Sequence, residues 1–313
     1  PKNLATMVPN MSGANAHESS VRQGGALELR FLAWAFWHSG INTQKELKAN
    51  PALDAALNMG APSFSDWLTR LPIRKGQTQL KLVPAYEQWA LKILTEADFT
   101  DYWKHPSFAP ALYWDDFPDM PILIVGGWYD SYTRSTFKNF KGLAVRNKGP
   151  VRVLVGPWTH GSSTVELSYA GDVEFGEAAA LESFRQLHLQ WFNWTLKGGD
   201  NGLAAEPPVR IFVMGGGGGQ RTASGRLMHG GRWRDEQEWP LARAEETKYY
   251  LHSGGKANTK HGDGTLGVKV PDGESPDVFL YNPADPVPTT GGALCCNPYF
   301  AANGAFDQNE VEE

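Results

Sequence analysis

The sequence has few cysteines, no long apolar run and no cluster of basic residues, and each shortage excludes a class of protein. The only two cysteines among its 313 residues are Cys295 and Cys296. Neighbouring cysteines rarely form a disulfide, and they do not provide the spaced pairs that zinc binds. No apolar stretch reaches the roughly 18 residues of a membrane span. A disulfide framework, a metal site and a membrane-spanning protein are therefore not expected.

The charge is mildly acidic and mixed along the chain. The net charge is −5, 41% of the residues are apolar, and no run of Lys or Arg occurs. This composition is ordinary for a globular protein and lacks the basic patch of a nucleic-acid-binding protein. We expect a small or neutral partner, with no nucleic acid, no membrane and no cofactor. The sequence leaves open whether the chain forms a homo-oligomer.

The two ends of the chain indicate a segment of a longer protein. The chain starts at Pro1, inside a stretch that reads as a strand, without Met and without the charged-then-apolar order of a signal peptide. It stops at an acidic GluValGluGlu with no closing element. We therefore expect further residues on both sides.

Residues 17–110 show a helical pattern that is rich in aromatic residues. Leu27, Phe31, Trp34 and His38 recur at spacings of three and four, which predicts one face of a helix that ends at Gly40. Further helices are predicted over 44–57, 63–71 and 84–95. We therefore expect an all-helical unit in this region.

The pattern changes at Pro121 to that of a parallel sheet. Residues 121–127 and 151–157 are apolar runs that end in glycine turns, as is typical of strands buried on both faces. The stretch between them, 132–143, has helical spacing, which completes a strand, helix and strand unit. Asp130 and His160 follow the two strands, at the carboxyl edge where α/β proteins bind ligands.

The last third of the chain becomes rich in short β runs. Residues 177–197 form the strongest predicted helix, closed by Gly198 and Gly199. After it, runs such as 209–214 and 248–252 are separated by Gly, Pro and Asp turns, which is typical of a sandwich or jelly roll. Glycines 215–219 are predicted to form a loop tip, because no helix start follows that would make them a phosphate cradle.

Asp130 and His160 are the candidate catalytic residues. An acid after one parallel strand and a histidine after the next, in that order, is the arrangement of α/β hydrolases. The acid would hold the histidine tautomer and stabilise the imidazolium. Taken singly, Asp130 reads as a turn or helix cap and His160 as a solvated loop residue. Because both residues follow neighbouring strands of one strand, helix and strand unit, their positions together favour the catalytic interpretation.

Eight colinear strings resemble a family of serine hydrolases, the one that includes cocaine esterase and X-prolyl dipeptidyl-peptidase. The strings are GGWYD, GPWTHG, GDVEFG, WFNWTLKGGDNG, EPPVRIFVMG, WRDEQEWPLA, YYLHSGG and YNPADPVPTTGG, and the resemblance covers nearly the whole chain. It implies an α/β fold, with part of an α/β-hydrolase domain in 1–16 and 111–203. A helical cap would occupy 17–110, and a partial C-terminal jelly roll of the galactose-binding-like kind would occupy 204–313.

The resemblance also implies a serine hydrolase that cleaves esters or amides through an acyl-enzyme. By position, Asp130 takes the place of the triad acid and His160 that of the triad base. The family nucleophile lies in a Gly-x-Ser-Tyr-x-Gly elbow, which this sequence lacks. Ser168 is a poor substitute, because Glu166 stands where glycine permits the tight turn and because Ser168 follows His160 along the chain.

The missing serine is expected upstream of the chain. Pro1–Pro9 resembles the strand that follows the elbow helix, so the serine should lie about one helix, roughly 15 residues, before Pro1. The oxyanion-hole donors are expected outside the chain as well. The segment by itself is therefore predicted to be inactive.

Three residues are candidates for the substrate pocket. Trp34 falls near a position that lines the acyl pocket in cocaine-esterase-like relatives, and Tyr132 takes the place of a pocket aromatic. Cys295 lies in a turn that relatives bring close to the site. The alternatives are a core aromatic for Trp34 and a buried small apolar side chain for Cys295.

Departures from the family pattern narrow the substrate. Where α-amino-acid ester hydrolases of the family carry acids that hold an ammonium group, this chain has Tyr132 and Thr133. We therefore expect a small-molecule ester or acyl substrate with an uncharged acyl group. An X-Pro dipeptidyl-peptidase is one alternative. A non-catalytic binding module is another, if the segment is the whole product.

Overall fold

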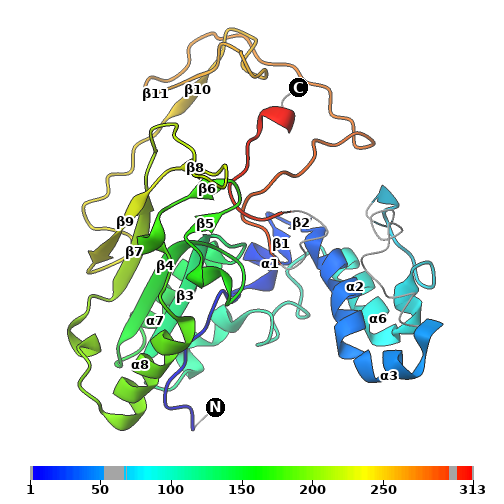
Figure 1. The fold of residues 1–313 in the computed structure, drawn as a ribbon. Helices are drawn as coiled ribbons and strands as arrows, with labels where there is room; N and C mark the ends of the chain where they lie inside the picture. The colour runs from blue at the N-terminus through cyan, green and yellow to red at the C-terminus, as the bar shows by residue number, and fades with distance from the viewer. Residues whose placement is uncertain (1–2, 53–66, 68, 296–301, 312–313) are drawn as a thin grey trace.

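The computed structural model describes residues 3–52, 67, 69–295 and 302–311 (Figure 1). Its centre is a four-stranded sheet in the order β3-β4-β7-β9. The strands are β3 (Ile122–Tyr129), β4 (Val151–Thr159), β7 (Val209–Met214) and β9 (Gly231–Glu236). The first three are parallel, and β9 runs antiparallel to β7.

The N-terminal residues run alongside β3 and extend the sheet. Met7 and Asn10 form parallel bridges with Ile122 and Val125. The Met11 amide donates to the Val125 carbonyl at 2.8 Å, and the Val125 amide donates to the Pro9 carbonyl at 3.0 Å. The apolar start of the chain therefore behaves as a further parallel strand, as its sequence predicted.

Helices cover both faces of the sheet. Because successive strand residues point to opposite faces, Ile122 and Ile124 pack in one core cluster with α7 (Thr133–Ala144), and Leu123 and Val125 pack in a second with α8 (Phe184–Lys197). The predicted order of strand, helix and strand is therefore confirmed.

The cap region stands beside the sheet in Figure 1 and contains helices and a small hairpin. Its elements are α1 (Ala16–Ser19), β1 (Arg22–Gln23), β2 (Ala26–Leu27), α2 (Arg30–Asn42), α3 (Gln44–Ala49) and α6 (Pro84–Thr95). The predicted helix over 84–95 is confirmed. The predicted helix over 63–71 and the end of that over 44–57 lie largely outside the described residues.

Two details of the cap differ from the sequence prediction. Leu27 lies in β2, paired with Arg22, so the helix begins three residues later, at Arg30. Gly40 does not end α2, which continues to Asn42. A helical glycine costs only about 1 kcal/mol relative to alanine, which packing of the flanking residues can offset. The hairpin also means that the region is not all-helical.

The sheet continues past residue 204, where the sequence had placed the start of a separate β domain. Residues 209–211 pair with 153–155 of β4, and all of β7 pairs with β9. A smaller sheet contains β5 (Tyr169–Ala170), β6 (Val173–Glu174) and β8 (Leu227–Met228). Residues 209–236 therefore complete the α/β layer.

A hairpin of β10 (Tyr250–His252) and β11 (Thr265–Gly267) lies away from the main sheet (Figure 1). These are the only strands in the described residues from 237 to 311, so the jelly roll stays a prediction. Short 3₁₀ helices occupy Gln79–Leu82, Pro110–Asp116, Thr164–Glu166, Glu177–Ala179, Leu203–Ala205 and Asn309–Val311.

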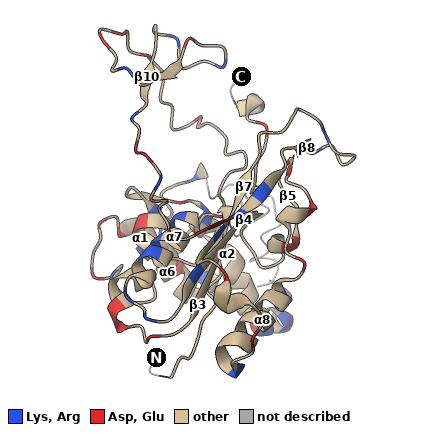
Figure 2. Cartoon of the chain, turned by 90° about the vertical axis from the view of Figure 1, so that its left-hand side faces the viewer, with Lys and Arg blue, Asp and Glu red and all other residues tan. Residues whose placement is uncertain are grey.

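The helix predicted over 177–197 forms only in part. It begins as an α-helix at Phe184, after Ser183 caps it by accepting from the Gln186 amide, and it ends at Gly198 with φ 66°. In the described residues, no helix is long and apolar enough to cross a bilayer. Figure 2 shows acidic and basic residues interspersed over the elements in view.

Candidate active site

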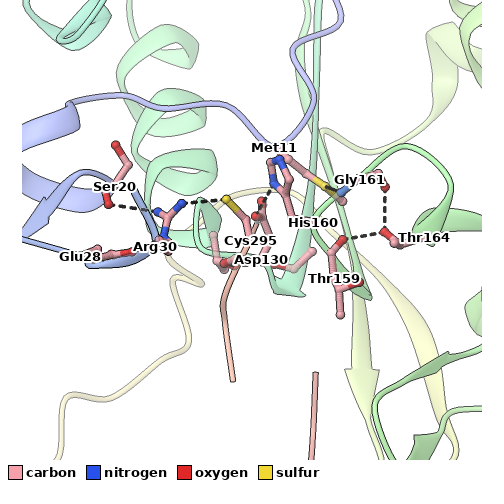
Figure 3. A network of polar contacts seen from close by, with 12 residues as sticks. Met11, Ser20, Glu28, Arg30, Asp130, Thr159, His160, Gly161, Thr164 and Cys295 are labelled. Atoms are coloured by element: carbon pink, nitrogen blue, oxygen red, sulfur yellow. Dashed lines mark hydrogen bonds and ion pairs between the residues drawn. The ribbon is translucent and has the colours of Figure 1, made fainter. Parts of the chain in front are cut away.

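The register of two strands brings Asp130 and His160 together. Tyr129 at the end of β3 pairs with Thr159 at the end of β4. Asp130 and His160 are the next residues along each strand, so both leave the sheet at its carboxyl edge. His160 Nδ1 lies 2.8 Å from Asp130 Oδ1. The sequence-predicted pair is therefore in direct contact (Figure 3).

The two side chains differ in exposure in the way that an acid and base pair requires. The Asp130 side chain is 0% exposed, whereas that of His160 is 27% exposed. A buried carboxylate that accepts from Nδ1 leaves Nε2 as the free ring nitrogen. Among the described residues, Nε2 has no hydrogen-bond partner, and neither has Asp130 Oδ2, which is buried.

Glycines permit the close approach of the two strand ends. A Cβ on Gly127 would lie 2.2 Å from the Trp158 carbonyl oxygen, and a Cβ on Gly156 would lie 2.3 Å from the Trp158 ring. Trp158 is fully buried, and its Nε1 donates to the Ala179 carbonyl at 3.0 Å. The glycines of both sequence strings are therefore needed for packing at the edge that carries the site.

The N-terminal segment also reaches the site. Gly161, directly after His160, donates its amide N–H to Met11 Sδ at 3.1 Å. Met11 has φ 44°, the only positive φ of a non-glycine residue in the described chain. Non-glycine residues with left-handed backbone conformations are uncommon and occur at functional sites and tight turns. The segment thus turns sharply beside His160.

Tyr132 lies beside His160, and its place in the substrate pocket stays a prediction. Its ring centroid is 5.4 Å from that of His160. Burial raises the pKa of the Tyr132 phenol above its ordinary value of 10.0, and the nearby Arg30 guanidinium opposes that rise. Tyr132 is therefore a neutral, half-buried aromatic beside His160 at physiological pH.

Cys295 is buried near the same site and touches a buried cation. It is 4% exposed, and its Sγ accepts a hydrogen bond from Arg30 Nη1 at 2.7 Å (Figure 3). The Arg30 guanidinium carbon lies 5.5 Å from the Tyr132 ring centroid. Cys295 is disulfide-bonded, which corrects the expectation that it is not; Cys296 lies outside the described residues.

Trp34 lies in an aromatic cluster of the cap. Its ring stacks on His38 at a centroid distance of 4.0 Å and contacts Trp89 at 5.2 Å and Phe31 at 6.4 Å. No contact joins it to Asp130 or His160 in the described chain. A place in the acyl pocket stays a prediction for Trp34, and its described contacts are those of a cap core residue.

Sequence reasoning missed Arg30 and its partner Glu28. The two form an ion pair whose side chains are 2% and 19% exposed. The available signal was a pair of opposite charges two residues apart within the apolar run 26–36. Both residues were assigned to the predicted helix, whereas in the structure Glu28 precedes α2 and Arg30 begins it.

Ser168 does not have the setting of a nucleophile. It stands between a 3₁₀ helix (Thr164–Glu166) and the two-residue strand β5, and no α-helix follows it directly. Glu166 accepts from the amide of Phe184 at 2.7 Å and so has a structural role. Within the described residues, no group of His, Cys, Asp and Glu side chains is arranged to hold a metal ion.

The sequence matches known proteins along nearly its whole length. It is 31% identical over 324 aligned positions to cocaine esterase of Rhodococcus sp. (strain MB1 Bresler), covering 99% of this chain and 50% of that protein. The chain thus spans half the length of this relative. Two crystal structures of a CocE/NonD family hydrolase from Staphylococcus aureus match with TM-scores of 0.45 and 0.44. Their identities are 19% and 18%, over 80% and 83% of this chain and 33% and 34% of theirs.

Two family models divide the chain between them. Residues 201–310 match the X-Pro dipeptidyl-peptidase C-terminal non-catalytic domain. Residues 1–162, which include both Asp130 and His160, match the model described as X-Pro dipeptidyl-peptidase (S15 family). Since that match covers more than half of the 313 residues, the chain belongs to the S15 family of hydrolases.

Proposed function

We propose that this protein is a serine hydrolase that cleaves carboxylic esters or acyl amides through an acyl-enzyme. Asp130 is the triad acid and His160 the triad base in this proposal. The observation that carries it is the 2.8 Å contact between Nδ1 of a partly exposed histidine and Oδ1 of a fully buried aspartate. Acyl transfer by a Ser, His and Asp triad needs this arrangement.

Each residue has a defined task in the reaction. Nε2 of His160 takes the proton from a serine hydroxyl as the oxygen attacks the substrate carbonyl carbon. The same proton passes to the leaving alcohol or amine when the tetrahedral intermediate collapses to the acyl-enzyme. Water then repeats both steps and releases the acid. Asp130 accepts from Nδ1–H throughout and stabilises the imidazolium.

The nucleophile in this proposal lies upstream of Pro1. Nε2 of His160 has no partner among the described residues, so a position for a hydroxyl remains open there. Asp130 Oδ2 is likewise buried without a donor. Buried carboxylate oxygens are normally hydrogen-bonded, which supports a site completed by residues outside the described chain. Cocaine esterase, of which this chain spans 50%, is long enough to supply them.

An ester substrate is favoured over an X-Pro dipeptide. A dipeptidyl-peptidase must hold the substrate's N-terminal ammonium, for which a carboxylate is the natural partner. The two carboxylates described at this site already have partners: Asp130 contacts His160, and Glu28 forms an ion pair with Arg30. The family model carries the dipeptidyl-peptidase description, so that activity is the second candidate.

One experiment separates these functions. The full-length protein is incubated with a fluorophosphonate, which labels activated serines, and is assayed with p-nitrophenyl butyrate and with alanyl-prolyl p-nitroanilide. We expect a single labelled serine upstream of Pro1, ester hydrolysis faster than anilide hydrolysis, and loss of both labelling and turnover in His160→Gln. Faster anilide hydrolysis would favour the peptidase. Absence of labelling and turnover in the wild type would favour a binding module.

The same assay applied to residues 1–313 tests the prediction for the segment. Without nucleophile and oxyanion hole we expect no turnover above background. Labelling of Ser168, or ester hydrolysis that His160→Gln abolishes in this segment, would show that the nucleophile lies within it.

A further inference from the structure

Arg30 is the most buried cation among the charged residues of the described core. It is 2% exposed, compared with 4% for Arg22 and 6% for Arg152. It begins α2, at the point where the cap hairpin joins the first long cap helix. Burying a guanidinium so fully is unfavourable unless several acceptors surround it.

Those contacts come from separate segments of the chain. Arg30 Nη2 donates to the Ser20 carbonyl at 3.0 Å, and Nη1 donates to Cys295 Sγ at 2.7 Å. Nε is paired with Glu28. Figure 3 shows the guanidinium directed at Cys295 on one side and at Ser20 on the other. One side chain therefore joins the entrance of the cap to the C-terminal segment.

The same guanidinium reaches the residue beside the triad base. It lies 5.5 Å from the Tyr132 ring centroid and opposes the effect of burial on the Tyr132 phenol. Tyr132 in turn lies 5.4 Å from the His160 ring. Arg30 does not reach the base itself, and its low exposure leaves no face for a substrate.

We propose that Arg30 is a positioning residue that holds Tyr132 and the Cys295 segment in place as adjoining walls of the acyl pocket, and so sets which acyl groups fit. This inference rests on the proposed hydrolase function. Glu28 neutralises the guanidinium, which agrees with an uncharged acyl group. The planar guanidinium suits this role, because its N–H donors hold two acceptors in a fixed relative orientation. A lysine ammonium has no such fixed geometry.

Arg22, in the hairpin that precedes α2, is a matched control. It is also buried, and it donates to the carbonyls of Gly25, Ile93 and Leu94, all within the cap. It has no contact with Tyr132 or Cys295. Loss of Arg22 should loosen the cap as loss of Arg30 does, without releasing the pocket walls.

The first test follows hydrogen exchange by mass spectrometry in the full-length protein, and it needs no activity. In Arg30→Met, amides of 128–133 and 291–295 should exchange about tenfold faster than in wild type, whereas Arg22→Met should change only cap amides. Arg30→Lys should fall between wild type and Arg30→Met. If Arg30→Met does not fold, the exchange rates of the same amides in Arg30→Lys still test the proposal. The proposal would be overturned if residues 128–133 and 291–295 exchange as slowly in an Arg30 variant as in wild type.

The second test measures selectivity with p-nitrophenyl acetate, butyrate and benzoate. Arg30→Met should change the ratio of KM values for benzoate and acetate about fivefold or more, with kcat and its pH profile little changed, and Arg22→Met should keep the wild-type ratio. A parallel shift for all three esters would reduce Arg30 to a structural role. If the wild type hydrolyses no ester, the proposed function fails, and the exchange measurement still decides whether Arg30 positions these segments.

Discussion

Tyr129 of β3 pairs with Thr159 of β4, and this register places the next residue of each strand, Asp130 and His160, within 2.8 Å of one another. The contact thus depends on the backbone of two parallel strands more than on the loops that follow. A rigid sheet edge is a suitable support for an acid and base pair, whose geometry must hold to a fraction of an ångström.

Under the proposed mechanism, replacing Asp130 should inactivate the full-length protein without unfolding it. Asp130→Asn keeps the shape of the side chain but favours the wrong histidine tautomer, and we expect kcat to fall by about 10⁴-fold. The measurement is p-nitrophenyl ester hydrolysis, with circular dichroism to check folding. Asp116→Asn, at an exposed acid, serves as the control. An Asp130→Asn enzyme with more than a tenth of the wild-type rate would remove Asp130 from the triad.

A methyl group at Gly127 should disrupt the strand ends that carry the site. Its Cβ would lie 2.2 Å from a backbone oxygen of Trp158, which cannot move aside as a flexible side chain can. We expect Gly127→Ala to lower the free energy of unfolding by about 3 kcal/mol. Gly216→Ala is the control, because nothing lies within 4 Å of its Cβ. Urea unfolding measures both, and equal stabilities would contradict the described packing.

The stability of the cap should fall in mild acid because of His38. Burial lowers the pKa of His38 below its ordinary value of 6.5, and the ring stacks on Trp34. The unfolded chain therefore binds a proton more readily than the folded one. The stabilising contribution is complete above pH 6.5 and is lost as the pH falls through the folded-state pKa.

Urea midpoints at pH 7.5 and pH 5 test this expectation. His38→Phe keeps an aromatic ring for stacking but does not titrate, so its midpoint should change less between the two pH values than that of the wild type. His261→Gln, at an exposed histidine, should behave as the wild type does. An unchanged pH dependence in His38→Phe would show that other groups cause the acid sensitivity.

The continuation of the sheet past residue 204 also has a measurable consequence. Phe212 on β7 is 1% exposed and packs in a cluster with Phe175 and Val173. We expect Phe212→Ala to destabilise the α/β unit by about 3–5 kcal/mol. The exposed Phe279, replaced by alanine, should have little effect. A separate unfolding transition that alone responds to Phe212→Ala would instead support a domain boundary at 204.

The local patterns of the sequence were sufficient for much of the α/β unit. Two apolar runs bounded by glycines predicted β3 and β4, and the helix between them was placed to within one residue at each end. The cap was predicted less well, because β1 and β2 are two residues each and carry no alternating pattern. The placement of β7 in the main sheet was missed, since a short apolar strand looks the same in a sandwich and in a parallel sheet.

The sequence by itself determined that an acid and a histidine follow consecutive buried strands, because burial on both faces leaves an unmistakable apolar run. Only the tertiary structure decided what surrounds that pair. Arg30 meets Cys295 across 265 positions of the chain, and no local pattern records a contact between residues so far apart. The pairing of Asp130 with His160 is a property of strand order, whereas the residues around the pair depend on how the cap and the C-terminal segment pack against the sheet.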